Sequence, residues 1–236
     1  ASSHIVKKFG MRNALQPDHL TVKLTGSCGQ SLGAFSVRGL KLEVQGDAND
    51  YVGKGLSGGT ITVRPLMSSP LKAEENTIIG NTVLYGATDG FLFASGRAGE
   101  RFAVRNSGAS VVVEGCGSNG CEYMTGGVAV ILGRIGANFG AGMTGGMAYV
   151  YDPEGVAEDF MNQESILTCV VGHPHWEMQL KGLIQRHLEE TGSRIAERIL
   201  GNWDRERLNF LQVCPKEMVD RLPYPLSDEV AKVPAE

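Results

Sequence analysis

Cys116 and Cys121 are the residues whose type and spacing most directly suggest chemistry. A C-x4-C pair can supply thiolate ligands to a metal ion or a cluster, but the sequence offers no second pair to complete such a site. In the repeat described below, Cys121 aligns with a column of inward-facing positions: Val52, Val83, Phe102 and Phe139. We therefore favour a buried structural thiol, with metal binding as the alternative.

His173 and His175 form a second candidate metal-binding pair. Pro174 separates them near the start of a predicted helix, so we favour an ordinary loop pair. A group of glycines is similar to a phosphate cradle: Gly53, Gly55, Gly58 and Gly59. A dinucleotide-binding fingerprint requires a strand, a glycine turn and a helix in succession. Strand follows strand here, so we interpret these glycines as turn residues.

Charged residues are densest in one stretch of the chain: Arg97, Glu100, Arg101, Arg105 and Glu114. This group is either an interdomain set of salt bridges or a solvated face. No arrangement of Ser, His and Asp, and no pair of carboxylates, can be argued from spacing to form a catalytic centre.

Composition excludes several classes of protein. The net charge of −4 argues against nucleic acid or an anionic membrane as a partner. No apolar run approaches the roughly 20 residues of a membrane span, and no signal peptide is visible. The 5 cysteines are odd in number and scattered, which indicates reduced thiols. We therefore expect a cytoplasmic protein, or a plastid protein if the source is a plant or alga.

An internal repeat organises most of the chain. Five segments align on these anchor residues: Gly59, Gly90, Ala109, Gly127 and Gly146. Successive anchors are 31, 19, 18 and 19 residues apart, and the first separation falls to about 19 if residues 65–76 are a loop insertion. Copies at Leu40 and, more weakly, from Leu20 extend the series backwards. The repeat is therefore about 19 residues long and occurs about seven times.

The residue pattern in each copy of the repeat predicts a short strand. The positions two and four after the anchor are aliphatic in every copy, whereas the positions between them are mixed. This period-2 alternation predicts a strand with one inward face. A 19-residue unit leaves no room for a crossover helix, and the signature of leucine-rich repeats is absent. We therefore predict an all-β fold, a parallel β-helix of about seven coils.

Two kinds of small residue recur at fixed places in the repeat. Glycines mark the predicted corners of the coils: Gly46, Gly58, Gly59, Gly90, Gly96, Gly108, Gly115, Gly126, Gly127, Gly133, Gly145 and Gly146. Hydroxyl side chains stand two residues before the anchors: Ser57, Thr88, Ser107, Thr125 and Thr144. Glycine permits left-handed backbone at corners. We expect the hydroxyls to form a hydrogen-bonded ladder in which each donates to the next.

The chain divides into two segments at the point where the repeat ends. We assign residues 1–155 to the β-helix with a short N-terminal lead-in, and residues 156–236 to a helical segment and tail that pack on it. Apolar residues recur on one helical face over 174–190. Ser193 is a plausible N-cap for a second helix, and residues 209–213 are predicted as a last short strand.

The outward-facing positions of the coils change character along the axis. They are polar in early coils, at Lys41, Glu43, Thr60 and Thr62. They become apolar in later coils: Phe91, Phe93, Val128, Val130, Met147 and Tyr149. Contiguous apolar surface usually marks a contact, so we expect this candidate docking face to be covered by the C-terminal helices or by other domains. The early polar face should remain solvated. No aromatic row of the kind that binds sugars is expected on the coils.

Several long strings resemble the glycine-motif (GXGXG) domain that closes the large chain of glutamate synthase. They are TGSCGQSLGAF (25–35), GDANDYVGKGLSGG (46–59), NTVLYGAT (81–88), AGERFAVRNSGA (98–109), GCEYMTGG (120–127), NFGAGMTGG (138–146) and RHLEETGSRIAERIL (186–200). The resemblance covers nearly the whole chain. Asn119 departs from the pattern, which has a histidine there, and this leaves the expected fold unaffected.

The resemblance implies a role within a larger enzyme. Such an enzyme converts glutamine and 2-oxoglutarate to two glutamates, with an amidotransferase domain that releases ammonia and a tunnel to a synthase domain that carries FMN and an iron–sulfur cluster. The resemblance implies a right-handed β-helix that braces these domains and supplies no catalytic, cofactor-binding or metal-binding residue. Oligomers would form through the parent enzyme. Alternatives are a β-helix subunit like that of formylmethanofuran dehydrogenase, a stand-alone binding module and a self-contained enzyme.

Overall fold

The computed structural model describes residues 1–10, 15–66 and 68–227. Residue 67 of the predicted loop insertion and the end of the predicted tail, 228–236, lie outside the described residues. The rest of the insertion, 65–76, contains only the short 3-10 helix η1 (Ala73–Glu75). The insertion therefore leaves the coil count unchanged.

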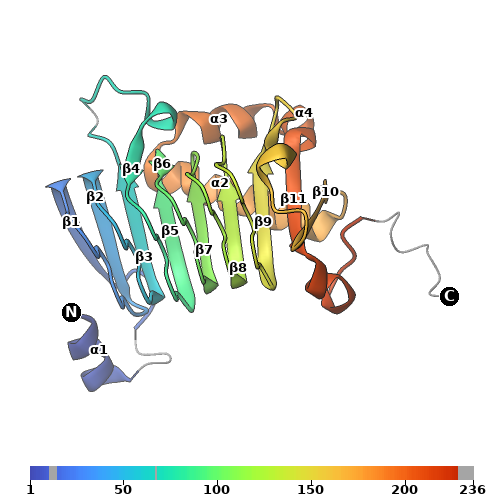
Figure 1. Ribbon diagram of the computed structural model, residues 1–236. Coiled ribbons are helices and arrows are strands. Elements are labelled where there is room, and N and C mark those ends of the chain that lie inside the picture. The colour runs from blue at the N-terminus through green and yellow to red at the C-terminus, as the bar shows by residue number, and fades with distance from the viewer. Residues whose placement is uncertain (11–14, 67, 228–236) are drawn as a thin grey trace.

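Seven strands, one from each coil, lie side by side in parallel along the main sheet (Figure 1). They are β1 (Leu20–Ser27), β2 (Leu40–Asp47), β3 (Ser57–Arg64), β5 (Asp89–Ala94), β7 (Ser107–Val113), β8 (Thr125–Ile131) and β9 (Gly145–Tyr151). A small second sheet pairs β4 (Thr77–Ile79) with β6 (Arg97–Ala98). The prediction of a parallel β-helix of about seven coils is confirmed.

The last coil is closed by antiparallel strands from the C-terminal segment. β11 (Phe210–Pro215) pairs antiparallel with β9, and β10 (Ile166–Val170) pairs antiparallel with β11. The strand predicted at 209–213 is thus present, although it lies one to two residues further along the chain. These two strands complete the sheet that the coils begin.

The inward positions of the strands fill one continuous core. The positions two and four after each anchor are buried there from the third coil on, and examples are Ile61, Leu92, Val111 and Val150. Each coil contributes the same two columns, so aliphatic side chains stack along the axis. Burial of a large aliphatic side chain contributes roughly 1.5–3 kcal/mol, which explains why the aliphatic columns recur without exception.

Opposite the main sheet, each coil turns through a five-residue arc in which alternate residues have positive φ, between 52° and 76°. The arcs are 31–35, 51–55, 82–86, 101–105, 119–123 and 138–142, and the positive-φ residues are the first, third and fifth of each. The third residue faces the core, because a Cβ built on Gly33 would lie 2.4 Å from Cδ1 of Ile61 in β3. The arcs therefore close the core from the side opposite the sheet.

Backbone N–H groups in the arcs bond alternately to the coils on either side. In arc 51–55, Tyr51 donates to a carbonyl of the next coil at 2.9 Å, Gly53 to the preceding coil at 2.9 Å and Gly55 to the next coil at 2.9 Å. Arc 101–105 repeats this order at 2.8, 3.0 and 3.0 Å. The positive φ values thus bend the chain without leaving buried N–H groups unpaired.

The predicted corner glycines serve two different purposes. Gly46, Gly96 and Gly115 have φ between 139° and 153°, where side chains are disfavoured. Gly108, Gly126 and Gly145 do not have positive φ, and there a Cβ would lie 2.0–2.4 Å from a carbonyl oxygen of the preceding coil. The expectation of left-handed backbone is wrong at these three positions and also at Gly59 and Gly133. Close stacking of the coils is what requires glycine at the three positions and at Gly133, where a Cβ would lie 2.5 Å from the carbonyl oxygen of Glu114.

The hydroxyl column bonds to backbone rather than to other hydroxyls. The Oγ atoms of Ser57 and Ser107 donate to carbonyls of the preceding coil at 3.5 and 2.9 Å, and Oγ1 of Thr88 does so at 3.5 Å. Each of these carbonyls also accepts the N–H of the same residue, which holds the hydroxyl beside it. The ladder expected between hydroxyls is therefore not formed by these three residues. Thr125 and Thr144 are exposed.

Helices occupy both ends of the chain. They are α1 (Ser2–Phe9), α2 (Pro174–Thr191), α3 (Arg194–Gly201) and α4 (Trp203–Glu206), with further 3-10 turns η2 (Ala157–Phe160), η3 (Arg207–Asn209) and η4 (Lys216–Arg221). Gly192 ends α2 with a φ of 69°, and the Ser193 side chain accepts the N–H of Ala196 as the N-cap of α3. The start of α3 at Ser193 is confirmed as predicted.

Close stacking at Gly108 predicts opposite effects for two glycine-to-alanine changes. Gly108→Ala places a Cβ 2.0 Å from the carbonyl oxygen of Thr88, so we expect a loss of about 1–3 kcal/mol in the free energy of unfolding. Gly182→Ala, in open space on α2, should instead raise it by up to about 1 kcal/mol. Urea denaturation of both variants measures the difference. Equal effects would contradict the stacking account.

Candidate functional site

The predicted docking face is covered by the chain's own helices. Phe93, Val130 and Tyr149 are fully buried and Met147 is nearly so, while Phe91 and Val128 are partly buried. They pack with residues of α2 and α3: Trp176, Leu180, Ile184, Ala196 and Ile199. Figure 1 shows α2 running across the strands from one coil to the next. This face is therefore not available for docking another domain.

Specific contacts also fix the helices on this face. The Arg186 guanidinium of α2 lies 3.9 Å from the ring centroid of Phe91, and the Tyr149 hydroxyl donates to Gln179 at 2.8 Å. Burial raises the pKa of Tyr149, which keeps its phenol neutral and able to donate this bond.

The early polar face is not solvated as predicted. Thr60 and Thr62 are only 2% and 3% exposed. Lys41 makes an ion pair of 2.6 Å with Glu190 of α2. Burial is the largest single influence and lowers the pKa of Lys41, but the hydrogen bonds and charges of Glu190, Glu43 and Asp18 together outweigh it, so the pKa is raised. The sequence reasoning failed here because α2 extends beyond the apolar coils and covers the polar ones too.

Cys116 and Cys121 are both buried in the main core, with no exposed surface. Burial raises the pKa of the Cys116 thiol to about 12 and that of Cys121 well above its usual value, which disfavours the thiolate form that binds metals. The predicted alignment is wrong by one residue, because Cys121 occupies the third position of its arc, as Ala103 does. The coil is 18 residues long at this point.

The other motifs have structural contacts of their own. The His173 side chain accepts the N–H of His175 at 3.1 Å and caps α2, and the ring of His175 stacks on Tyr224 with centroids 4.1 Å apart. Gly53 and Gly55 lie in an arc. Within the residues that the structure describes, no three His, Cys, Asp or Glu side chains gather as a metal site.

The predicted charge cluster is divided between different sides of the coils. Arg101 pairs with Glu122 at 3.1 Å on an arc, and Arg105 lies 6.0 Å from the ring centroid of Tyr123. Glu114, in contrast, is 2% exposed beneath the helices. The charged residues therefore form neither one set of salt bridges nor one solvated face.

Glu114 lies at the centre of a buried polar cluster that sequence analysis did not find. Its Oε1 accepts the hydroxyls of Ser95 at 3.1 Å and Ser193 at 2.5 Å, and Nε2 of His187 lies 3.5 Å away. Ser193 also caps α3, and His187 belongs to α2. One carboxylate therefore joins the α2–α3 junction to the coil. The signal in the sequence was a lone acidic residue at an outward position among coils whose outward positions are apolar.

The cluster is incompletely satisfied by the described residues. Oε2 of Glu114 and both ring nitrogens of His187 are buried without a hydrogen-bond partner among them. Buried polar groups without partners are costly, so the cluster depends on the remaining contacts and on exact helix placement.

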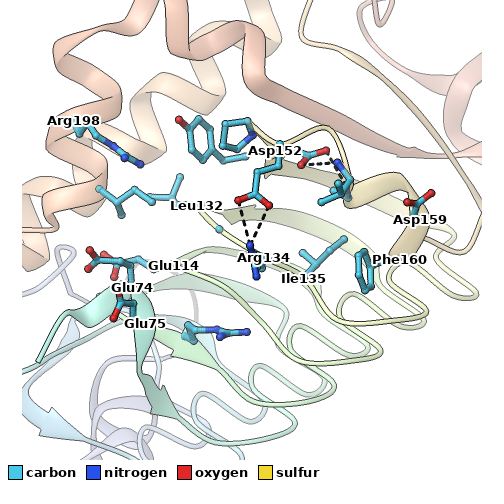
Figure 2. A pocket seen from close by; sticks show the side chains of 18 residues that line it. Glu74, Glu75, Glu114, Leu132, Arg134, Ile135, Asp152, Asp159, Phe160 and Arg198 are labelled. Carbon is cyan, nitrogen blue, oxygen red and sulfur yellow. Dashed lines mark hydrogen bonds and ion pairs between the residues drawn. The ribbon is translucent and has the colours of Figure 1, made fainter.

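A groove of about 880 Å³ opens beside Glu114 (Figure 2). Its lining comes from the corner at Leu132 to Ile135, the loop from Asp152 to Phe160, α3 and η1. Arg134 makes a bidentate ion pair with Glu154 at 3.1 and 3.2 Å on one side. Arg198 reaches over the groove from α3 (Figure 2). The groove lining mixes apolar and charged side chains.

The buried cluster predicts strong coupling between Glu114 and His187. Glu114→Leu should lower the free energy of unfolding by about 3 kcal/mol, because it removes the acceptor shared by two buried hydroxyls and the carboxylate 3.5 Å from the imidazole. Combining it with His187→Leu should cost less than the sum of the single changes, by about 1 kcal/mol or more. Urea denaturation of the four proteins gives the coupling, and strict additivity would refute it. Glu154→Leu, in an exposed pair, should change stability by less than about 1 kcal/mol.

Among the described residues, no helix has the length and apolarity needed to cross a membrane. Comparison with known proteins identifies a family. A family model described as the GXGXG motif matches residues 1–216.

Three relatives illustrate the similarity. A glutamate synthase [NADPH] large chain from Azospirillum brasilense is 66% identical over 95% of this chain. Glutamate synthase [NADH] from Schizosaccharomyces pombe is 52% identical over 92%, and ferredoxin-dependent glutamate synthase 2 from Synechocystis sp. is 49% identical over 93%. The chain spans 15%, 10% and 14% of the lengths of these relatives. It belongs to the GXGXG-motif family and is similar to one part of glutamate synthase large chains.

Proposed function

We propose that this chain is the structural β-helix domain of a glutamate synthase, which makes two glutamates from glutamine and 2-oxoglutarate. In this role it braces an amidotransferase domain and an FMN-containing synthase domain so that the ammonia tunnel between them stays aligned. Its residues are not assigned to catalysis. The remainder of the longer polypeptide would hold the catalytic cysteine, FMN and the iron–sulfur cluster, in the cytoplasm or in a plastid.

The observation that carries this proposal is the stiffness of the coil stack. The strands bond from coil to coil on one side, and the arcs do so on the other. At about 4.8 Å between strands, the seven coils extend roughly 29 Å from β1 to β9. A stack bonded on both sides of a filled core resists bending, so it can hold two attached bodies at a fixed separation.

The surrounding contacts support the same role. The helices that cover the main sheet are joined to the coils by the buried Glu114 cluster and by the Lys41–Glu190 ion pair. The stack is thus stiffened across its width as well as along its axis. The relatives named above are all glutamate synthases, which favours this function over a subunit of a formylmethanofuran dehydrogenase-like complex.

Removal of one coil from the full-length enzyme tests the proposal. Deletion of residues 119–137 joins equivalent arc positions and shortens the stack by one coil, about 4.8 Å. We expect glutamine hydrolysis to persist while more ammonia escapes per glutamine consumed, because the two reaction centres are no longer in register.

The matched control is deletion of residues 68–72, which lie in the loop insertion and leave the coil number unchanged. It should leave ammonia transfer intact. Circular dichroism and thermal unfolding confirm that each variant is folded. Full retention of ammonia transfer in a folded one-coil deletion would contradict the bracing role.

A further inference from the structure

Four large aromatic side chains are exposed on the arcs, on the side of the coils opposite α2 and α3. Phe35 is 61% exposed, Tyr51 39%, Tyr85 37% and Tyr123 51%. We call these four residues the aromatic ridge. No aromatic row on the coils was expected from the sequence, which did not reveal these four exposed side chains. The repeat was aligned on its strands, whereas these residues lie on the arcs.

Two of these rings pack against glycines in the arc of the next coil. A Cβ on Gly55 would lie 2.5 Å from the ring of Phe35, and a Cβ on Gly142 would lie 2.4 Å from the ring of Tyr123. Both glycines are the fifth residue of their arc, one coil beyond the aromatic residue. The rings thus contact the neighbouring coil at these glycines, while much of each ring remains exposed. The ridge is consequently a preformed surface that needs little ordering to bind.

The charge of the ridge differs from that of the chain. The six arcs carry three cationic side chains, Lys54, Arg101 and Arg105, and one anionic side chain, Glu122. The whole chain has a net charge of −4. Lys54 lies 5.5 Å from the ring centroid of Tyr51, and Arg105 lies 6.0 Å from that of Tyr123. Aromatic and arginine side chains of this kind are enriched at the centres of protein interfaces.

We propose that the aromatic ridge is the surface on which the rest of the longer polypeptide packs, through a segment that is apolar and acidic. This inference rests on the proposed structural function and names the face that performs it. The relatives are about seven to ten times longer than this chain, so most of such a polypeptide lies outside it. The main-sheet face is already covered by α2 and α3. Two copies meeting ridge to ridge would bring like charges together, which disfavours a second copy as the occupant.

Hydroxyl-radical footprinting of the full-length enzyme tests the assignment without any substitution. Tyr224, which is 43% exposed, provides an internal reference of the same residue type. We expect the modification rates of Tyr51, Tyr85 and Tyr123 to be at least about fivefold below that of Tyr224, because an interface core excludes water. Rates equal to that of Tyr224 would overturn the proposal. Protection that develops only with rising protein concentration, together with a dimer mass, would also overturn it and assign the ridge to a second copy.

A charged substitution provides a second readout in the same enzyme. Tyr123→Glu should raise the modification rates of Phe35, Tyr51 and Tyr85 towards that of Tyr224, because it places a charge within the interface. The matched control is Met178→Glu on α2, at a side chain that is 71% exposed, and it should leave those rates unchanged. Unchanged rates in both variants would count against the ridge.

If the ridge is modified freely while the one-coil deletion still releases ammonia, only this inference fails. If the ridge is protected while that deletion transfers ammonia fully, the proposed function fails instead.

Discussion

Each coil has to turn within five residues while its backbone N–H groups still bond to the coils on both sides. A β-strand cannot bend that sharply, and an ordinary turn would direct its N–H groups within itself. Alternate positive φ values meet both requirements, since successive odd positions of the arc donate forwards, backwards and forwards again. Left-handed backbone costs roughly 1–2 kcal/mol for a residue with a side chain. Glycine avoids that cost at 6 of the 18 positive-φ positions in the arcs, whereas the other 12, such as Leu84 and Cys121, carry a side chain.

The arcs also determine what each side of the coil can do. Their second and third residues face the core, and their first and fifth residues face outward. The main sheet lies on the opposite side, and α2 and α3 cover the outward-facing side chains of its strands. Glu114 connects those helices to the coils through Ser193 and His187. The coils are covered on their sheet side and expose aromatic side chains on their arc side, and this asymmetry is one reason why we propose a bracing role.

Much of the fold could be predicted from the sequence because strand columns repeat at a nearly constant spacing. The anchors from Gly59 to Gly146 located the strands, and Ser193 located the start of α3. Positions within the arcs were harder to predict. One coil is 18 residues long, so an alignment at a 19-residue spacing assigned Cys121 to a position one residue from its place in the arc. The burial of Thr60 and Thr62 depends on where α2 crosses the sheet, which no local pattern encodes. Glu114 and His187 are 73 residues apart in sequence, so only the tertiary structure brings them together.

Hydrogen–deuterium exchange of the arc amides is the most direct test of the central claim that the arcs are bonded parts of the coil stack. The amides of Gly53, Leu84, Ala103 and Cys121 donate to the preceding coil at 2.7–3.0 Å. They should therefore exchange slowly, within about tenfold of the central amides of β7 and β8. The loop at 68–72 supplies the fast reference. Exchange of the four arc amides at the loop rate would show that the arcs open freely, which would contradict a stiff, doubly bonded stack.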